Sequence, residues 1–160
     1  MFEFITQAVI DTLNNPLLVS LVLGALPVSE IRGASIYAFS IGQPWLILPA
    51  MFVNILVSPL ILLFWNLVNI PRIASFALGR SLEQRLLKFG KSYEKQGLIA
   101  LILFIGIPLP VTGVYTGTLL AELLGIKREK ILVAASAGVV VATILMFMLL
   151  GGFSLFLTNQ

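Results

Sequence analysis

The sequence predicts an all-α integral membrane protein, an inverted repeat of two re-entrant helical hairpins, each followed by a transmembrane helix, with interfacial amphipathic helices. Of the 160 residues, 59% are hydrophobic and 11% are charged, whereas a soluble domain carries about 25% charged residues. Most charges gather in residues 72–95 and 127–130, which leaves uncharged apolar runs long enough to enter a bilayer. Proline, glycine and hydroxyl residues interrupt two of these runs, and these interruptions predict the hairpins.

Two of the four apolar segments are predicted to be ordinary spanning helices. Residues 45–70 and 131–157 are each long enough, at about 1.5 Å of rise per residue, to exceed the roughly 30 Å hydrocarbon core. In the second of them, Ala134, Gly138 and Ala142 recur at four-residue steps. This stripe of small residues favours close packing of helices.

The other two segments, 17–41 and 98–126, are divided near their centres by "LPVSEIRG" and "IPLPVTGVYTG". Their first arms, about 17–26 and 98–107, supply roughly 15 Å of helix, half of the core thickness. An arm of that length reaches the midplane and stops, so we expect hairpins that return to their own side, with second arms beginning near Gly33 and Gly117. The residues predicted to shape the tips are Pro27, Gly33, Pro108, Pro110, Gly113 and Gly117.

The distribution of basic residues predicts the orientation in the membrane. Residues 72–95 hold six basic residues and residues 127–130 hold three, and short loops rich in lysine and arginine face the cytoplasm. The two clusters lie on the same side only if segment 98–126 enters the membrane and returns. The region before residue 17 and the turn around Gln43 hold no basic residue, so the first hairpin should enter from the outer face. This arrangement predicts a multi-pass protein of the cell membrane.

Two stretches are predicted to be interfacial helices, residues 2–13 and 81–95. The second is amphipathic, with leucines on one face and lysines toward anionic head groups of the inner leaflet.

An offset of 83 residues aligns the two halves of the chain. It places Pro27 on Pro110, the hydroxyl of Ser29 on that of Thr112, and Gly42 on Gly125. The chain is therefore interpreted as one membrane domain, 1–160, with repeat 1 at about 1–70, a cytoplasmic linker at about 71–97 and repeat 2 at about 98–160. Inverted repeats with broken helices at the midplane are typical of secondary transporters.

Non-helical backbone inside a bilayer exposes polar groups that cost several kcal/mol each, so protein or a watered cavity must satisfy them. Two tips arriving from opposite faces would satisfy each other and create a polar site. The predicted substrate- or ion-binding residues are Ser29, Glu30, Arg32, Asn54, Thr112, Tyr115 and Thr116. Asn54 lies one helical turn from Ser58, which is alternatively a hydroxyl that relieves the kink at Pro59.

Glu30 and Arg32 are the most informative of these residues. A charge at the bilayer centre costs at least about 2.5–3.5 kcal/mol on insertion scales, and such residues usually carry function. In that interpretation Glu30 accepts a proton or cation and Arg32 is its counter-charge or binds an anion. In the alternative, the two form a buried ion pair that pins the first tip.

Several classes of function are excluded by residue types that the chain lacks. It has no cysteine and no histidine, which removes thiolate chemistry, imidazole metal ligands and nucleophile pairs that use histidine. Its one aspartate, Asp11, excludes a two-aspartate protease. We therefore expect no enzyme, no cofactor and no metal site, and the net charge of +3 indicates cytoplasmic loops rather than a nucleic-acid partner.

"LPVSEIRGASIYA" followed by "GIPLPVTGVYTGTLLA" resembles the small multidrug export family of prokaryotes, over nearly the whole chain. That family is distantly similar to the DedA and VTT-domain membrane proteins, a resemblance that implies paired re-entrant hairpins and transport of lipid carriers or scrambling of phospholipids. The match is closest at Pro27, Glu30, Arg32 and Gly33. DedA-type proteins bring basic residues into the second hairpin, where this chain has Thr112, Gly113 and Tyr115, and this departure weakens the case for a lipid-phosphate substrate.

The function expected from these observations is a small membrane exporter with a midplane site, coupled to H⁺ or a cation and acting on a small molecule or a lipid. One alternative is a DedA-like lipid scramblase or lipid-carrier flippase. Another is a four-helix exporter of the small multidrug resistance type, which needs four straight spans. The expected partners are membrane lipids, the substrate and a second copy of the chain, since a homodimer is the simpler way to enclose a cavity.

Overall fold

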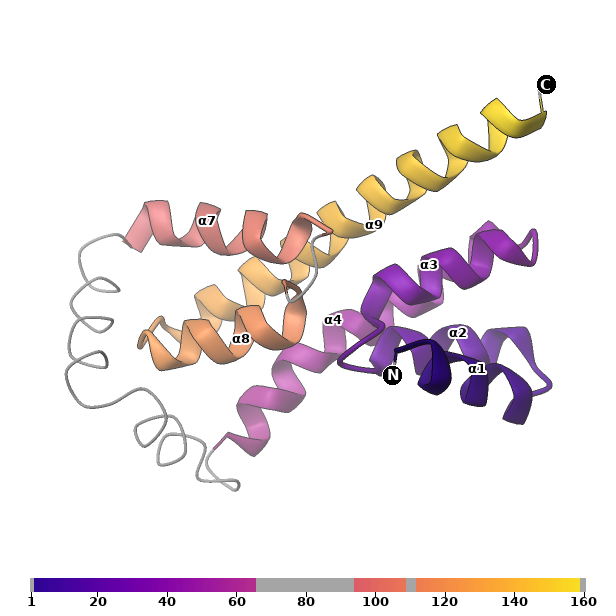
Figure 1. The fold of residues 1–160 in the computed structure, drawn as a ribbon. Coiled ribbons are helices and arrows are strands. Elements are labelled where there is room, and N and C mark those ends of the chain that lie inside the picture. The colour runs from indigo at the N-terminus through magenta and orange to yellow at the C-terminus, as the bar shows by residue number, and fades with distance from the viewer. Residues whose placement is uncertain (1, 66–93, 109–111, 159–160) are drawn as a thin grey trace.

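The computed structural model describes residues 2–65, 94–108 and 112–158, and every regular element in them is helical (Figure 1). The all-α prediction is confirmed for this part of the chain. The elements are α1 (Phe2–Thr12), α2 (Pro16–Ala25), α3 (Glu30–Ser40), the 3₁₀ helix η1 (Pro44–Leu46), α4 (Ile47–Phe64), α7 (Glu94–Gly106), α8 (Val114–Leu123) and α9 (Arg128–Thr158). The predicted helix 2–13 is thus present as α1. The basic run 72–95 and the amphipathic segment 81–95 lie almost wholly outside the described residues, as does Pro110.

Within the described residues, two helices are long and apolar enough to cross a membrane: Pro44–Phe64, with 21 residues, and Arg128–Phe153, with 26. They correspond to the two predicted spanning segments. Large apolar side chains such as Phe52, Leu63 and Met148 are exposed along them, which suits contact with lipid. Together these features mark a membrane protein.

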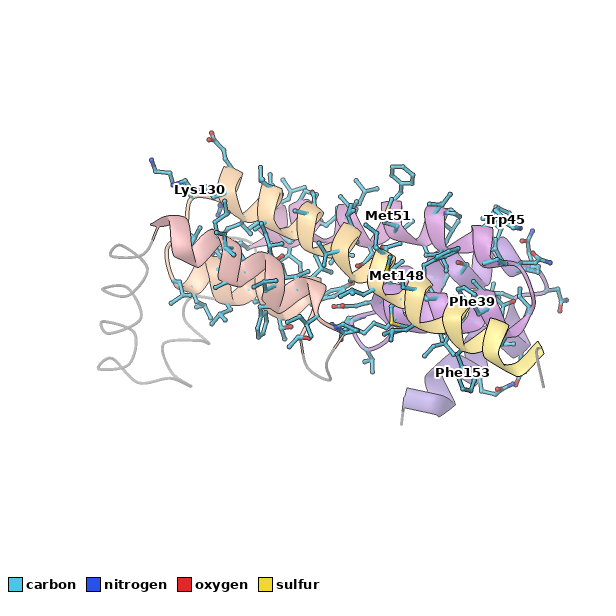
Figure 2. All side chains as sticks on the ribbon, turned by 90° about the horizontal axis from the view of Figure 1, so that it is seen from above. Phe39, Trp45, Met51, Lys130, Met148 and Phe153 are labelled. Carbon is cyan, nitrogen blue, oxygen red and sulfur yellow. The ribbon has the colours of Figure 1, made fainter. Side chains whose placement is uncertain are left out.

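Helix α4 and helix α9 contact each other and run in opposite directions. Figure 2 shows this arrangement, because Trp45, just before α4, lies at the same end of the molecule as Phe153 near the end of α9, whereas Lys130 lies at the other end.

Helix α2 is bounded by residues that the sequence makes easy to recognise. Asn15 caps its start, because the side-chain oxygen accepts hydrogen bonds from the amides of Leu17 (2.9 Å) and Leu18 (3.4 Å). Pro16 occupies the first turn, where its missing N–H costs nothing. The helix ends at Ala25, two residues before Pro27, which cannot continue it.

The helices that follow the interruptions begin earlier than predicted. Helix α3 begins at Glu30 and α8 begins at Val114, three residues before Gly33 and Gly117. The backbone explains the difference, since φ is 50° at Glu30 and 146° at Gly113. The chain changes direction at these two residues, and the following residues are already helical.

Helices α3 and α8 end in the same kind of turn. Gly42 has φ 68° and Gly125 has φ 69°, values that favour glycine. In each turn an amide one residue after the glycine bonds back to a helical carbonyl, from Gln43 to Ala38 at 2.9 Å and from Ile126 to Ala121 at 3.1 Å. The two glycines are 83 residues apart in the sequence.

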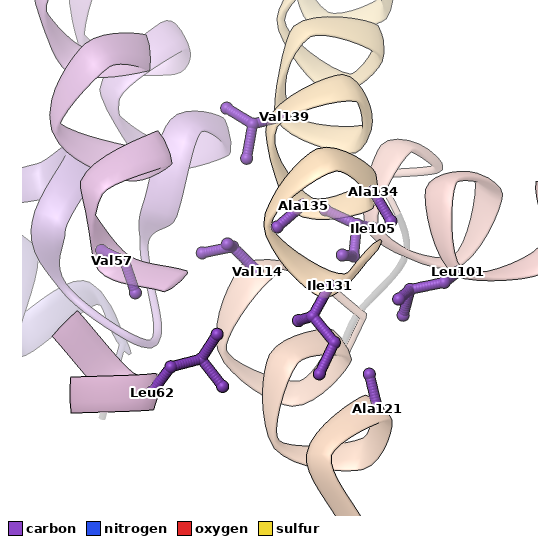
Figure 3. Packing of buried hydrophobic residues seen from close by; sticks show 10 residues of the cluster. All are labelled: Val57, Leu62, Leu101, Ile105, Val114, Ala121, Ile131, Ala134, Ala135 and Val139. Atoms are coloured by element: carbon purple, nitrogen blue, oxygen red, sulfur yellow. The ribbon is translucent and has the colours of Figure 1, made fainter. Parts of the chain in front are cut away.

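Two apolar clusters form the core, and α4 and α9 contribute to both. One cluster lies among α2, α3 and α4, where Leu23 and Ile31 are buried. The other lies where α4, α7, α8 and α9 meet (Figure 3). Ile105 packs tightly between two helices of this cluster, against Gly117 of α8 and Gly138 of α9. A Cβ atom added to Gly117 would lie 2.5 Å from Cγ1 of Ile105, and one added to Gly138 would lie 2.6 Å from the Cβ atom of Ile105. The predicted small-residue stripe on α9 does pack closely.

Candidate functional site

Residues 26–29 separate α2 from α3, and the described residues between α7 and α8 are 107, 108, 112 and 113. We call these the first break and the second break. The residues that flank them contact each other near the middle of the molecule (Figure 1). The polar groups of each break are therefore satisfied in part by the other one.

Glu30 enters this meeting point from the first break. Its side chain is 5% exposed, and Oε1 accepts a hydrogen bond from the amide of Tyr115 at 3.3 Å. The amide of Val114 lies beside the same carboxylate. These two amides belong to the first turn of α8, so the carboxylate occupies the positive end of that helix. The left-handed backbone at Glu30 is uncommon for a residue with a side chain and is held in place by these surroundings.

Arg32 reaches the second break. One guanidinium nitrogen donates to Oγ1 of Thr112 at 3.0 Å and to the carbonyl of Ile107 at 3.4 Å. The Thr112 hydroxyl donates to the same carbonyl at 2.9 Å. This carbonyl directly follows the end of α7, where helical partners are missing. Two side chains thus satisfy a backbone group that the interruption exposes.

The carbonyl groups at the end of α2 accept hydrogen bonds from side chains of two other helices. Nδ2 of Asn54, on α4, donates to the carbonyl of Gly24 at 2.8 Å. The hydroxyl of Tyr115, on α8, donates to the carbonyl of Ala25. The last two carbonyls of α2 and the carbonyl that follows α7 therefore accept hydrogen bonds from side chains of other segments.

The structure brings four of the predicted site residues into direct contact across the breaks: Glu30, Arg32, Thr112 and Tyr115. Asn54 is placed at the end of α2 rather than between the tips. Ser29 is buried in the first break, and its hydroxyl oxygen has no hydrogen-bond partner within the described part of the chain. Thr116 lies, partly buried, one residue farther along α8.

The residues predicted to shape the tips have different environments. Gly33 is buried in α3 and its amide bonds to the carbonyl of Ser29 at 3.0 Å. Gly113 lies against Glu30, and Gly117 lies against Ile105. Pro27 is exposed and Pro108 is half-buried.

The interpretation of Glu30 and Arg32 as a structural pair stays a prediction, since the two charges attract each other and each residue also bonds to the opposite break. Glu30 bonds to the Tyr115 amide and Arg32 to Thr112 and Ile107. A salt bridge within the described residues joins Glu122 and Arg128 at 2.8 Å, at the turn between α8 and α9.

Sequence reasoning missed one polar contact near the site. The hydroxyl of Thr118 donates to that of Ser58 at 2.9 Å, and both side chains are buried. Ser58 thus links α4 to α8, and its role in relieving the kink at Pro59 stays a prediction. Nothing in the sequence pairs these two residues, which are 60 positions apart.

The site offers one carboxylate, one guanidinium and several hydroxyl groups. No group of three or more acidic, histidine or cysteine side chains that suits a metal ion occurs in the residues that the structure describes. This set of groups suits the binding and release of a polar ligand, a proton or a hard cation.

Comparison with known proteins identifies the family of the chain. Residues 30–145 match the model of a family described as "Putative small multi-drug export protein". The matched region begins at Glu30 and includes α3, α4, α7, α8 and the first part of α9. No curated protein and no solved structure matches the chain.

Proposed function

Because the chain belongs to the family of small multi-drug export proteins, we propose that it is a membrane exporter whose site lies where the two breaks meet. The substrate is a small molecule or a lipid, and its movement is coupled to a proton or a cation. The observation that carries this proposal is the pair of contacts across the breaks, from Glu30 to the amide of Tyr115 and from Arg32 to Thr112.

The position of Glu30 supports its role as the coupling group. Ionisable residues within membrane segments are expensive and are functional by default. Glu30 adds a second cost, because its backbone is left-handed, and strained backbone of this kind clusters at functional sites. The ionised carboxylate accepts a hydrogen bond from the first turn of α8. Binding a proton or a cation removes that negative charge, weakens its attraction to the helix end and so favours separation of the breaks.

Re-entrant hairpins arranged as an inverted repeat fit the lengths and contacts of the helices. The helices beside the breaks have 10 to 13 residues, which at about 1.5 Å per residue is too short to cross a roughly 30 Å core. Arg32 bonds to the carbonyl that follows α7, and Tyr115, 83 residues later than Arg32, bonds to the last carbonyl of α2. The turn glycines Gly42 and Gly125 have the same spacing. Such crossed contacts support two related halves that meet at the midplane.

Replacing the two charged residues tests the proposed coupling. The protein is reconstituted in vesicles, and the movement of the fluorescent cation ethidium is followed under an imposed proton or sodium gradient. We expect Glu30→Gln to fold and to lose gradient-driven movement, because glutamine keeps the shape and the hydrogen bonding but cannot carry a proton. The double variant Glu30→Gln with Arg32→Gln should remain inactive.

The control is the double variant Glu122→Gln with Arg128→Gln, which removes the ion pair at the α8–α9 turn and should keep transport. Recovery of transport when both Glu30 and Arg32 are neutral would instead identify the two charges as structural.

The same vesicles separate export from lipid scrambling. A scramblase equilibrates labelled phospholipid between leaflets without any gradient, and equilibration that Glu30→Gln leaves unchanged would favour that function over export. The four-helix alternative needs straight spans at 17–41 and 98–126. Each of these segments is instead divided into two helices, so the structure gives this alternative no support.

A further inference from the structure

The end of α2 gathers acceptor groups that lack the usual helical donors. The carbonyl of Leu23 loses its donor because residue 27 is a proline, which has no N–H. The carbonyl of Gly24 accepts from Asn54, and that of Ala25 accepts from Tyr115. Both Leu23 and Gly24 are buried. This is also the negative end of the helix dipole.

Two buried side-chain oxygens have no partner among the described residues: Oδ1 of Asn54, whose amide nitrogen bonds to this helix end, and Oγ of Ser29, whose backbone amide bonds to the carbonyl of Leu26 at 3.2 Å. Asn54 is 1% exposed and Ser29 is 3% exposed. Because Nδ2 of Asn54 bonds to the Gly24 carbonyl, Oδ1 of the same amide lies close to that carbonyl. Ser29 follows Leu26, the residue that caps α2, by three positions. Buried polar atoms are normally satisfied, so these oxygens indicate a ligand.

The chemistry around the helix end favours a cation as that ligand. The acceptors are carbonyl, amide and hydroxyl oxygens, the kind of ligand that hard cations prefer. Arg32, the basic residue in the first turn of α3, donates to Thr112 and to the carbonyl of Ile107. Glu30, next to Ser29 in the chain, supplies a buried negative charge. The lack of a cluster of three acidic, histidine or cysteine groups in the described residues disfavours a divalent ion.

We propose that an alkali cation, sodium in the first instance, binds at the end of α2 between Oδ1 of Asn54, the hydroxyl of Ser29 and the last carbonyls of the helix. Ends of interrupted helices coordinate cations in this way in secondary transporters. The idea that sodium is the coupling ion rests on the proposed function. The idea that sodium binds at this place is independent of that function and can be tested without measuring transport.

The test is the thermal unfolding of the purified full chain in detergent, followed by the fluorescence of Trp45 and Trp65. Sodium chloride is compared with choline chloride at equal ionic strength, so that screening is the same in both. Because a ligand that binds only the folded state stabilises it, we expect the midpoint to rise with sodium and to level off, by on the order of 5 °C at concentrations far above Kd.

Two substitutions at Asn54 locate the effect. Asn54→Leu has a similar volume and no oxygen, so the sodium response should disappear. Asn54→Asp replaces the amide by a carboxylate, so half-saturation should occur at a sodium concentration about tenfold lower, the size expected of one added charge that interacts by roughly 1.4 kcal/mol. Ser20→Ala is the control, because Ser20 is a buried serine on the same helix whose hydroxyl bonds to Leu46 at 2.9 Å. It should lower the midpoint and keep the full sodium response.

Equal midpoints in sodium and choline would overturn the proposal, as would a full sodium response in Asn54→Leu. If Asn54→Leu does not fold, Asn54→Asp decides, and an unchanged half-saturation contradicts the site. The sodium response is measured without transport and therefore fails or succeeds separately from the Glu30→Gln experiment.

Discussion

The carboxylate of Glu30 lies against the α-carbon of Gly113, so closely that a Cβ atom added to this glycine would be 2.0 Å from Oε2. The two residues are 83 positions apart, and Glu30 directly follows the first break whereas Gly113 is the last residue of the second. Gly113 has φ 146°, a conformation that residues with a side chain rarely adopt. The missing side chain at Gly113 is thus what allows the carboxylate to reach the amides at the start of α8.

Replacing Gly113 by alanine should separate the breaks. The added methyl group collides with the carboxylate, and the backbone conformation alone costs about 1–3 kcal/mol for a residue with a Cβ atom. We expect a lower midpoint of thermal unfolding and loss of transport. Gly152→Ala is the matched control, because a Cβ atom there meets nothing within 4 Å. A Gly113→Ala protein as stable as the Gly152→Ala protein would show that the contact with Glu30 is not tight.

The contact between the breaks also predicts a crosslink. The chain has no cysteine, so the pair Ser29→Cys and Thr112→Cys introduces the only two thiols. A short bifunctional reagent should join them in the folded protein, since Arg32, three residues after Ser29, bonds to Thr112 at 3.0 Å. The pair Ser29→Cys and Ile99→Cys, with the second thiol at an exposed position in the middle of α7, should stay unlinked. Persistent failure of the first pair in a folded protein would remove the argument for a shared site.

The positions of the interruptions could be predicted from the sequence because local chemistry decides them. Pro27 stops α2 whatever surrounds it, and Asn15 with Pro16 starts that helix from its own side chain and ring. The turns at Gly42 and Gly125 could be predicted from the glycines themselves, because a turn of this kind needs a left-handed backbone, which glycine adopts readily. These features depend on neighbours in the chain.

The partners within the site could not be predicted in the same way, because packing between distant segments decides them. The start of α3 at Glu30 depends on a left-handed backbone that propensity disfavours, and it is supported by the contact with Tyr115, 85 residues away. The carbonyls of Ala25 and Ile107 are backbone groups and leave no mark in the sequence, although their partners Arg32 and Tyr115 were predicted as site residues. The sequence therefore indicates the donors of the site but not what they bind.

Ile105 and Gly117 should show strong coupling in a double-mutant cycle. A Cβ atom on Gly117 would meet Cγ1 of Ile105 at 2.5 Å and Cδ1 at 2.7 Å, so Gly117→Ala alone should cost about 1–3 kcal/mol of unfolding free energy. Ile105→Ala leaves a cavity and costs about 2–5 kcal/mol. Because it removes both clashing atoms, the double variant should be more stable than the sum of the single changes predicts.

Replacement of Gly138 serves as the comparison for this double-mutant cycle. A Cβ atom on Gly138 would lie 2.6 Å from the Cβ atom of Ile105, which alanine retains, and 3.1 Å from the carbonyl oxygen of Ile102. Ile105→Ala should therefore rescue Gly117→Ala and not Gly138→Ala. Equal rescue of both variants, measured by unfolding in denaturant, would contradict the packing of Ile105 between α8 and α9.

The re-entrant topology predicts which side of the membrane each turn faces. Single cysteines at Thr12, Ser40 and Lys127 lie at exposed positions at the end of α1, at the end of α3 and before α9. If segments 17–41 and 98–126 enter and return, Thr12→Cys and Ser40→Cys should react with an impermeant thiol reagent added outside intact cells. Lys127→Cys should react only after the membrane is opened, because the basic turn 127–130 is held in the cytoplasm. Four straight spans would place Ser40 and Lys127 on one side and Thr12 on the other, so labelling in that pattern would contradict both hairpins.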